Sequence, residues 1–256
     1  MRKSLLSLLV GGLLTTSVSV QGQQAGVLTR KTEVGAAVYA YQVFVPAKLA
    51  GRKNLPVIVF LHGINQRGVG GVVPTKGASG ALVRRYLEKV PAIVLVPQCR
   101  NGSYWTDAEM GKMVMQALDQ TVAEFGADKE RLYLTGVSMG GYGVWDLASR
   151  HPGKFAALIA ICGGSPLSDG GGDNVDRFLP IARQIGHTPA WVFHGADDAV
   201  VPVSESRGMV KALKTIDGNN ARYSEYANVG HNVWLKALAE TELLPWLLAQ
   251  RLDKVY

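Results

Sequence analysis

The chain has 256 residues, of which 47% are hydrophobic and 8% aromatic, so it has enough apolar surface for a large buried core and does not belong to the disordered class. Its formal net charge is +7, but the basic residues are scattered and form only short pairs such as Arg84-Arg85. A nucleic-acid-binding surface needs clustered basic residues with interleaved aromatics, and the sequence lacks this pattern. We therefore expect a globular protein that does not bind nucleic acid.

The first 22 residues have the three-part organisation of a secretory signal peptide. Arg2 and Lys3 are basic, residues 5–14 form an apolar run, and small and polar residues follow. The run is shorter than the roughly 20 residues that span a bilayer, so an uncleaved anchor is the less favoured alternative. We expect export to the periplasm or the medium. Residues 23–256 would then form one soluble domain without stable membrane insertion, in an oligomeric state that the sequence leaves open.

Beyond the signal segment, the hydrophobic pattern alternates between strands and helices. Short apolar runs, typical of strands covered on both faces, occur at residues 55–61, 92–96, 131–135, 155–161 and 190–193. Partly exposed strands are expected at 38–45, which Pro46 ends, and at 222–226. Helices are expected at 79–89, from Asp107 to Phe125, at 139–150 and from Asn232 to about Arg251. This alternation predicts an α/β fold with a doubly wound, mostly parallel sheet.

The alternation breaks between Ser165 and Gly186, where residues 170–172 are all glycine and a short apolar stretch follows. This segment is a candidate for a mobile flap. The acidic residues and glycines at 169–176 lack the ordered ligand spacing of a calcium loop, so no metal ion is expected there.

The two cysteines, Cys99 and Cys162, each follow a buried strand. Export to an oxidising compartment would permit a disulfide bond. In the expected sheet, however, these two strands are not neighbours, which favours two separate thiols. The sequence does not decide between the two states.

Ser138 lies in the segment Gly136-Val137-Ser138-Met139-Gly140, between an expected strand and an expected helix. Glycines at both ends of such a turn allow a strained backbone and close packing of strand and helix, which exposes the serine hydroxyl at the apex. Because glycine is common in this chain, about 0.2 accidental matches to this five-residue pattern are expected. The strand and helix around the segment make Ser138 the candidate nucleophile.

A serine nucleophile needs a base, and five histidines are available. Where a serine occupies such a turn, the acid and then the histidine follow it in the chain. This order excludes His62, and it disfavours His194, which precedes any suitable acid. His231 lies on a loop before the last helix and is the candidate base. The acid is Asp197 or Asp198, both just after the strand at 190–193, and spacing alone does not choose between them.

The developing negative charge on the substrate oxygen needs two backbone N–H donors. The turn supplies one from Met139, and the loop after the strand at 55–61 supplies the other from Ile64, beside Gly63. His62 would then pack or form hydrogen bonds beneath the site. Loop residues near the expected site are candidates for substrate binding: Gln98, Tyr104, Trp105 and Trp234.

Several segments together resemble the phospholipase/carboxylesterase and predicted-peptidase branch of the α/β-hydrolases, over about residues 38 to 250. They are 61–63, 97–99, 136–143, 161–164, 194–202 and 230–232. The resemblance implies a catalytic triad of Ser138, Asp198 and His231, because in relatives the acid falls four residues after the histidine of the His-Gly pair. It implies no cofactor. The branch is also similar to secreted feruloyl and acetyl-xylan esterases, so the substrate does not follow from the fold.

These features favour hydrolysis of carboxylic esters through an acyl-serine intermediate, with a small-molecule or polysaccharide-linked ester as substrate. A peptidase of the prolyl-oligopeptidase type uses the same parts, but usually carries a large gating domain for which this chain has no room. A non-catalytic binding module on a hydrolase scaffold is the third alternative. The sequence does not identify the acyl or alcohol group.

Overall fold

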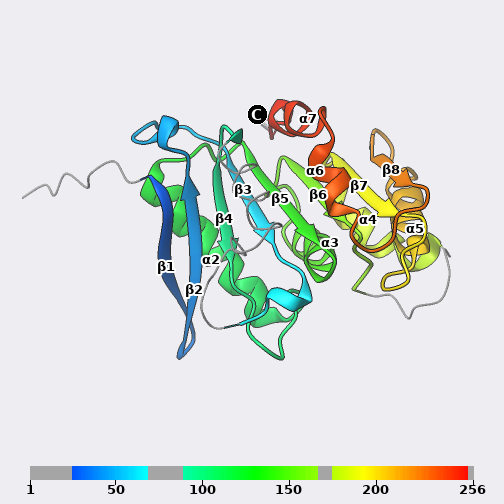
Figure 1. The fold of residues 1–256 in the computed structure, drawn as a ribbon, viewed down its shortest axis with the longest axis horizontal. Coiled ribbons are helices and arrows are strands. Elements are labelled where there is room, and N and C mark those ends of the chain that lie inside the picture. Colours follow the sequence, from blue (N-terminus) through cyan, green and yellow to red (C-terminus); the bar gives the residue numbers. More distant parts are fainter. Residues whose placement is uncertain (1–24, 69–88, 167–174, 253–256) are drawn as a thin grey trace, which may run out of the picture.

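The computed structural model of the chain describes residues 25–68, 89–166 and 175–252 (Figure 1). The expected signal peptide, the three glycines at 170–172 and the expected helix at 79–89, apart from Lys89, lie outside these residues. Among the residues that are described, no helix has both the length and the apolar character needed to cross a membrane.

Eight strands form one sheet, in the order β1-β2-β4-β3-β5-β6-β7-β8 (Figure 1). Their bounds are β1 Gly26–Val34, β2 Ala37–Val45, β3 Val57–Leu61, β4 Ile93–Pro97, β5 Leu132–Val137, β6 Ala157–Ile161, β7 Ala190–Gly195 and β8 Arg222–Tyr226. The first two strands form an antiparallel hairpin, and β2 is antiparallel to β4. All other neighbours are parallel. The expected mostly parallel α/β sheet is therefore confirmed.

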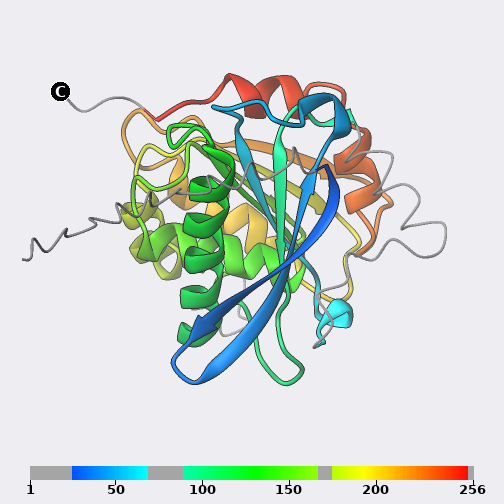
Figure 2. The same cartoon turned by 90° about the vertical axis from the view of Figure 1, so that its left-hand side faces the viewer.

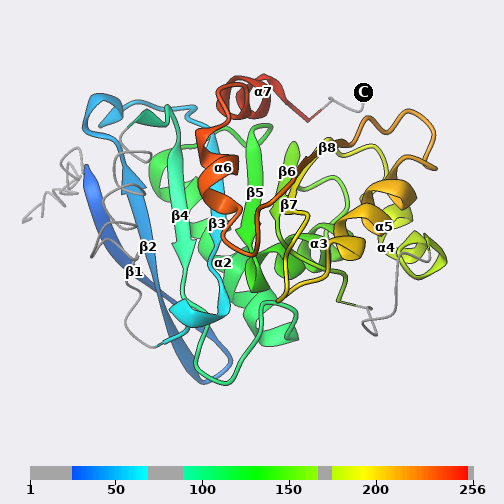
Figure 3. The ribbon, with the colours of Figure 1, turned by 45° about the vertical axis from the view of Figure 1, so that its right-hand side comes forward.

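Helices cover both faces of the sheet, with α2, α3, α4 and α5 on one face and α6 and α7 on the other (Figures 2 and 3). Their bounds are α2 Ala108–Phe125, α3 Met139–Arg150, α4 Leu179–Ile185, α5 Val203–Leu213, α6 Trp234–Ala239 and α7 Leu243–Ala249. Short 3₁₀ turns occupy Ala47–Leu49, Ile64–Gln66 and Val175–Arg177.

The two-residue period of the strands divides the core into two clusters. In β3, Val57, Val59 and Leu61 pack with the residues of α2 to α5, whereas Ile58 packs with α6 and α7. Strands covered on both faces must be apolar at every position, and this explains the continuous hydrophobic runs in the sequence.

Three elements differ from the sequence-based expectation. The strand β1 was not expected, because its side chains alternate between exposed and half-buried and are mostly polar. The helix α5 was also missed. The single C-terminal helix is in fact two helices, with extended backbone at Glu240. Pro245 explains the break, because it has no N–H to donate to residue 241 and its ring would collide with that carbonyl in a continuous helix.

The second half of the proposed flap is an element of the core. Ile181, Ala182 and Ile185 of α4 are buried, and α4 packs against α3 and α5. Residues 167–174 lie outside the described part of the chain. The described second half of the segment at 165–186, which was a candidate for a mobile flap, is thus packed against the core.

Candidate active site

Ser138 lies at a sharp turn between the end of β5 and the start of α3. Its backbone has φ 56° and ψ −119°, a conformation that costs a non-glycine residue about 1–3 kcal/mol. The flanking glycines are required by space, because a Cβ at Gly136 would lie 2.2 Å from Gly140 O and one at Gly140 would lie 2.0 Å from Leu61 O. Close packing of β5, α3 and β3 thus holds Ser138 in this strained conformation.

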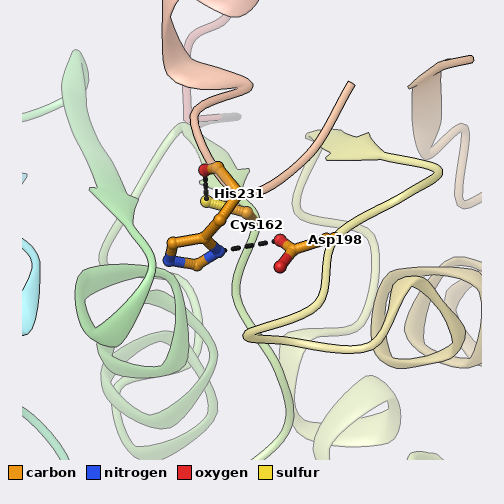
Figure 4. Close-up of side chains that lie close together, drawn as sticks. All are labelled: Cys162, Asp198 and His231. Carbon is orange, nitrogen blue, oxygen red and sulfur yellow. Dashed lines mark hydrogen bonds and ion pairs between the residues drawn. The ribbon is translucent and has the colours of Figure 1, made fainter. Parts of the chain in front are cut away.

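The structure brings Ser138, His231 and Asp198 together from three separate loops. His231 Nε2 lies 2.8 Å from Ser138 Oγ, and His231 Nδ1 lies 2.8 Å from Asp198 Oδ2. Figure 4 shows the second contact, with the imidazole and the carboxylate facing each other. The neighbouring Asp197 is exposed. The geometry therefore matches a serine–histidine–acid relay that uses Asp198, the acid implied by the resemblance.

The Asp198 carboxylate is fully buried and held by several donors. Its Oδ1 accepts the N–H groups of Val200 and Val201 at 2.8 and 2.9 Å, and its Oδ2 accepts from His231. Burial alone would raise the pKa of Asp198, but the hydrogen bonds from His231, Val201 and Val200 outweigh it and lower the pKa. The acid therefore stays ionised beside the imidazole.

On the opposite side of Ser138, His62 supports the loop after β3. His62 Nδ1 donates to Gly63 O at 2.8 Å, and His62 Nε2 accepts the N–H of Cys99 at 3.2 Å. A Cβ placed on Gly63 would lie 3.7 Å from Ser138 Cβ, so this loop runs beside the serine. Burial lowers the pKa of His62, which keeps the ring neutral and able to accept the Cys99 bond.

Two residues expected to bind substrate serve this loop instead. Trp105 is 0% exposed, and its Nε1–H donates to His62 O at 2.8 Å. Gln98 is also buried, and its Nε2 donates to Gln66 O at 2.7 Å and lies 3.1 Å from His62 Nε2. The structure corrects the expectation that they line a pocket, because side chains this deeply buried support the loop and do not face a substrate. Loop position suggested an exposed site, and only tertiary packing shows the burial.

The other two expected substrate-binding residues differ in position. Tyr104 is 47% exposed, lies beneath the Arg67 guanidinium and is not part of the cavity wall. Trp234 lines the cavity next to Ser138, and its ring contacts that of His231 edge to face at 6.3 Å. Only Trp234 is brought to the candidate site.

A cavity of about 400 Å³ opens beside Ser138 and His231. Apart from the residues around the serine, its described wall is mostly apolar and includes side chains of β3, β4, β6 and the C-terminal helices. Ile64, Val137, Val200, Trp234 and Leu238 form the part around the site. An apolar wall of this kind suits an uncharged, apolar ligand group.

Cys162 lies beneath the loop that carries His231 (Figure 4). Its Sγ–H donates to His231 O at 3.5 Å, and burial raises the pKa of the thiol to about 12. Cys162, Asp198 and His231 are the one group within the described ranges whose ligand atoms lie close enough to hold a metal, all within 4.8 Å. The hydrogen bonds within the group account for its arrangement. Cys99 and Cys162 are both free thiols, which confirms the expectation of two separate cysteines.

Comparisons with known proteins point to esterases. No family model matches the chain. It is 28% identical to a bifunctional acetylxylan esterase/xylanase from Neocallimastix patriciarum over 172 residues, which cover 66% of this chain and 23% of that protein. It is 28% identical to feruloyl esterase B from Neurospora crassa over 160 residues, which cover 57% of this chain and 52% of that protein.

A solved structure of a thermostable esterase superposes with a TM-score of 0.74 at 33% identity, over 88% of this chain and 63% of the other. The chain thus spans less than two thirds of the length of each of these relatives. The fold is the α/β-hydrolase fold, and the chain is similar to the esterases of that superfamily.

Proposed function

We propose that this chain is a serine hydrolase that cleaves carboxylic esters through an acyl-serine intermediate. The observation that carries the proposal is the pair of 2.8 Å contacts that join Ser138, His231 and Asp198, with Ser138 at the apex of a strained turn. A serine hydroxyl becomes a nucleophile when a positioned base removes its proton, and this arrangement supplies the base and orients it.

In the proposed reaction, His231 Nε2 takes the Ser138 proton as Oγ attacks the ester carbonyl carbon. The tetrahedral intermediate collapses when the C–O bond to the alcohol breaks, and His231 returns the proton to the departing alcohol. Water then attacks the acyl-serine with the same base, and the acid and free serine are released. Asp198 stays ionised throughout and stabilises the protonated imidazole.

We assign the oxyanion hole to the N–H groups of Met139 and Ile64. Met139 is the first residue of the 12-residue helix α3, where N–H groups are unpaired and the helix dipole favours negative charge. The Gly63 carbonyl accepts from both His62 Nδ1 and Gln66 N, which fixes the peptide plane that it shares with Ile64. In a trans peptide the N–H points opposite to the carbonyl, so the Ile64 N–H is directed away from the His62 ring.

Relatives named for acetylxylan and feruloyl ester hydrolysis support acetyl or feruloyl esters of polysaccharides as the substrate class. The apolar wall beside Ser138 is compatible with these uncharged acyl groups. The signal-like segment at residues 1–22 supports export to the periplasm or the medium, and an enzyme that acts on a polymer outside the cell has to be exported.

The test is turnover of p-nitrophenyl esters by residues 23–256, comparing the wild type with Ser138→Ala. We expect the variant to lose about 10⁶-fold in kcat. Ser149→Ala is a matched control. Ser149 lies in helix α3, about 16 Å along the helix axis from Ser138, and its hydroxyl donates to Asp146 O. Equal, slow rates for the wild type and Ser138→Ala would refute the proposal.

A series of acyl chain lengths, measured beside acetylated and feruloylated xylan, identifies the substrate. Release of acetate or ferulate that is lost in Ser138→Ala supports polysaccharide esters. Cleavage of a peptide amide panel without any ester activity would instead favour the peptidase alternative.

A further inference from the structure

We infer that His194 is a positioning residue for the catalytic acid, and that it acts as the neutral tautomer protonated at Nε2. The inference rests on the proposed function and deepens it, because it concerns the same relay. His194 lies in β7, four residues before Asp198, and its side chain is 0% exposed. The order of residues disfavours His194 as the base, and the geometry gives it a different role.

The neighbours of the ring determine where its proton lies. His194 Nε2 is 3.0 Å from Val201 O and 3.2 Å from Asp198 Oδ2, and both of these oxygens can only accept. The proton is therefore on Nε2. Burial lowers the pKa of His194, so Nδ1 stays unprotonated and accepts the Ser206 hydroxyl at 2.6 Å. Both ring nitrogens have a partner, and the tautomer is fixed by the acceptors around it.

These contacts form a closed ring around the acid. Asp198 Oδ1 binds the N–H of Val201, the carbonyl of Val201 binds His194 Nε2, and His194 Nε2 contacts Asp198 Oδ2. Rotation of the Asp198 carboxylate away from His231 would break contacts in this closed set of interactions. His194 therefore limits the acid to the orientation in which Oδ2 faces His231 Nδ1.

The His194 imidazole is also held by a residue outside the turn that carries Asp198. Ser206, which donates to His194 Nδ1, is 1% exposed and belongs to α5, a helix that packs on the sheet. On the neighbouring strand, Glu225 pairs with His194 in the β7–β8 register. Glu225 is itself paired with Arg207. Other titratable groups near the acid are His231, the base itself, together with Cys162 and Tyr142. A neutral His194 orders the acid without adding a positive charge that would compete with the protonated base.

The tautomer leads to a specific experiment. A glutamine amide reaches the position of His Nε2 and can donate to Val201 O and Asp198, whereas an asparagine amide reaches only the position of Nδ1. We expect His194→Asn to lower kcat about 10- to 100-fold, with KM within about twofold, and His194→Gln to recover most of that loss. His187→Asn is the matched control, because His187 is an exposed histidine.

A second measurement separates positioning from a purely structural role. The proton shared by His231 Nδ1 and Asp198 gives a downfield ¹H NMR signal, which reports on the acid–base contact in the resting protein. We expect His194→Asn to shift or broaden this signal, and His194→Gln and His187→Asn to keep it. A structural role would lower thermal stability without this pattern.

Ser206→Ala covers the case in which His194→Asn does not fold. It keeps the imidazole but removes the donor to Nδ1, and we expect a smaller shift of the same proton signal and a loss in kcat of about threefold. The inference is overturned if His194→Asn and His194→Gln have equal kcat and equal signals, or if Ser206→Ala moves neither quantity. Absence of ester hydrolysis in the wild type would refute the proposed function, while the NMR comparison would still test His194.

Discussion

Two buried histidines flank the candidate active site, and they carry their protons on opposite nitrogens. On the oxyanion flank, defined as His62, Gly63, Gln98 and Cys99, His62 donates from Nδ1 and accepts at Nε2. On the acid flank, defined as Asp198, His194, Ser206 and Cys162, His194 donates from Nε2 and accepts at Nδ1. Both rings are neutral, since burial lowers both pKa values.

The difference follows from what each ring has to hold. On the oxyanion flank, His62 orients the peptide plane between Gly63 and Ile64 by donating to the Gly63 carbonyl. On the acid flank, the neutral His194 ring orients the ionised Asp198 carboxylate and contributes a donor without a charge. The two histidines thus adopt different tautomers, and the acceptors around each ring decide which tautomer forms.

The largest expected effect tests whether Asp198, on the acid flank, orients His231 for catalysis. We expect Asp198→Asn to lower kcat about 10⁴-fold, because an amide would favour the wrong imidazole tautomer in His231. Steady-state kinetics on a p-nitrophenyl ester measures the loss. Asp197→Asn is the matched control, since Asp197 is adjacent but exposed, and we expect it to retain full activity. Equal losses in both variants would mean that Asp198 has no special role.

The next effect tests whether the two flanks have opposite tautomer requirements. At His62 the donor is Nδ1, so we expect His62→Asn to keep more activity than His62→Gln, the reverse of the order at His194. Loss of the correct peptide orientation removes part of one oxyanion donor, which corresponds to a decrease in kcat of about 100-fold for His62→Gln. If the same substitution, Asn or Gln, retains more activity at both His62 and His194, the two histidines do not have opposite tautomers.

A smaller effect concerns stability against pH. Both histidines have folded-state pKa values below the ordinary value of 6.5, so below pH 6.5 the unfolded chain binds protons that the folded chain does not. Stability is therefore fully present above pH 6.5 and is lost as the pH falls, by at most about 1.4 kcal/mol per pH unit for each histidine.

Urea unfolding at pH 7 and pH 5 measures this loss. We expect His194→Gln to reduce the difference between the two pH values, and the exposed His187→Asn to leave it unchanged. A wild-type protein that is equally stable at both values would show that the two rings are not buried as neutral groups.

The smallest effect is expected from thiol reagents. Each flank contains a buried cysteine, Cys99 or Cys162, and burial raises the pKa of each thiol to about 12. Because the thiolate is the reactive form, iodoacetamide at pH 8 should neither label nor inactivate the native protein, while both cysteines react in denaturant. Mass spectrometry identifies the site. Rapid labelling of Cys162 alone would show that the acid flank opens more readily than the oxyanion flank.

The sequence predicted the parallel sheet and identified Ser138 and His231 as candidates that the structure places side by side, while the choice between Asp197 and Asp198 came only from the family resemblance. Strands covered on both faces give continuous apolar runs, and the turn at Ser138 requires glycines at fixed positions because backbones pass within contact distance there. Such signals are local, so a single sequence contains them. The helix break before α7 and the helix α5 were missed, because weak local preferences give way there to packing and to the missing N–H of Pro245.

What the sequence determined is the set of chemical groups and their order along the chain. Only the tertiary structure decided what these groups contact: Trp105 and Gln98 face inward to the loop after β3, and His194, disfavoured as a base, lies behind Asp198. The physical reason is that burial and hydrogen bonding depend on residues far apart in the chain. His62 bonds to a backbone N–H 37 positions away, and His231 bonds to an acid 33 positions away.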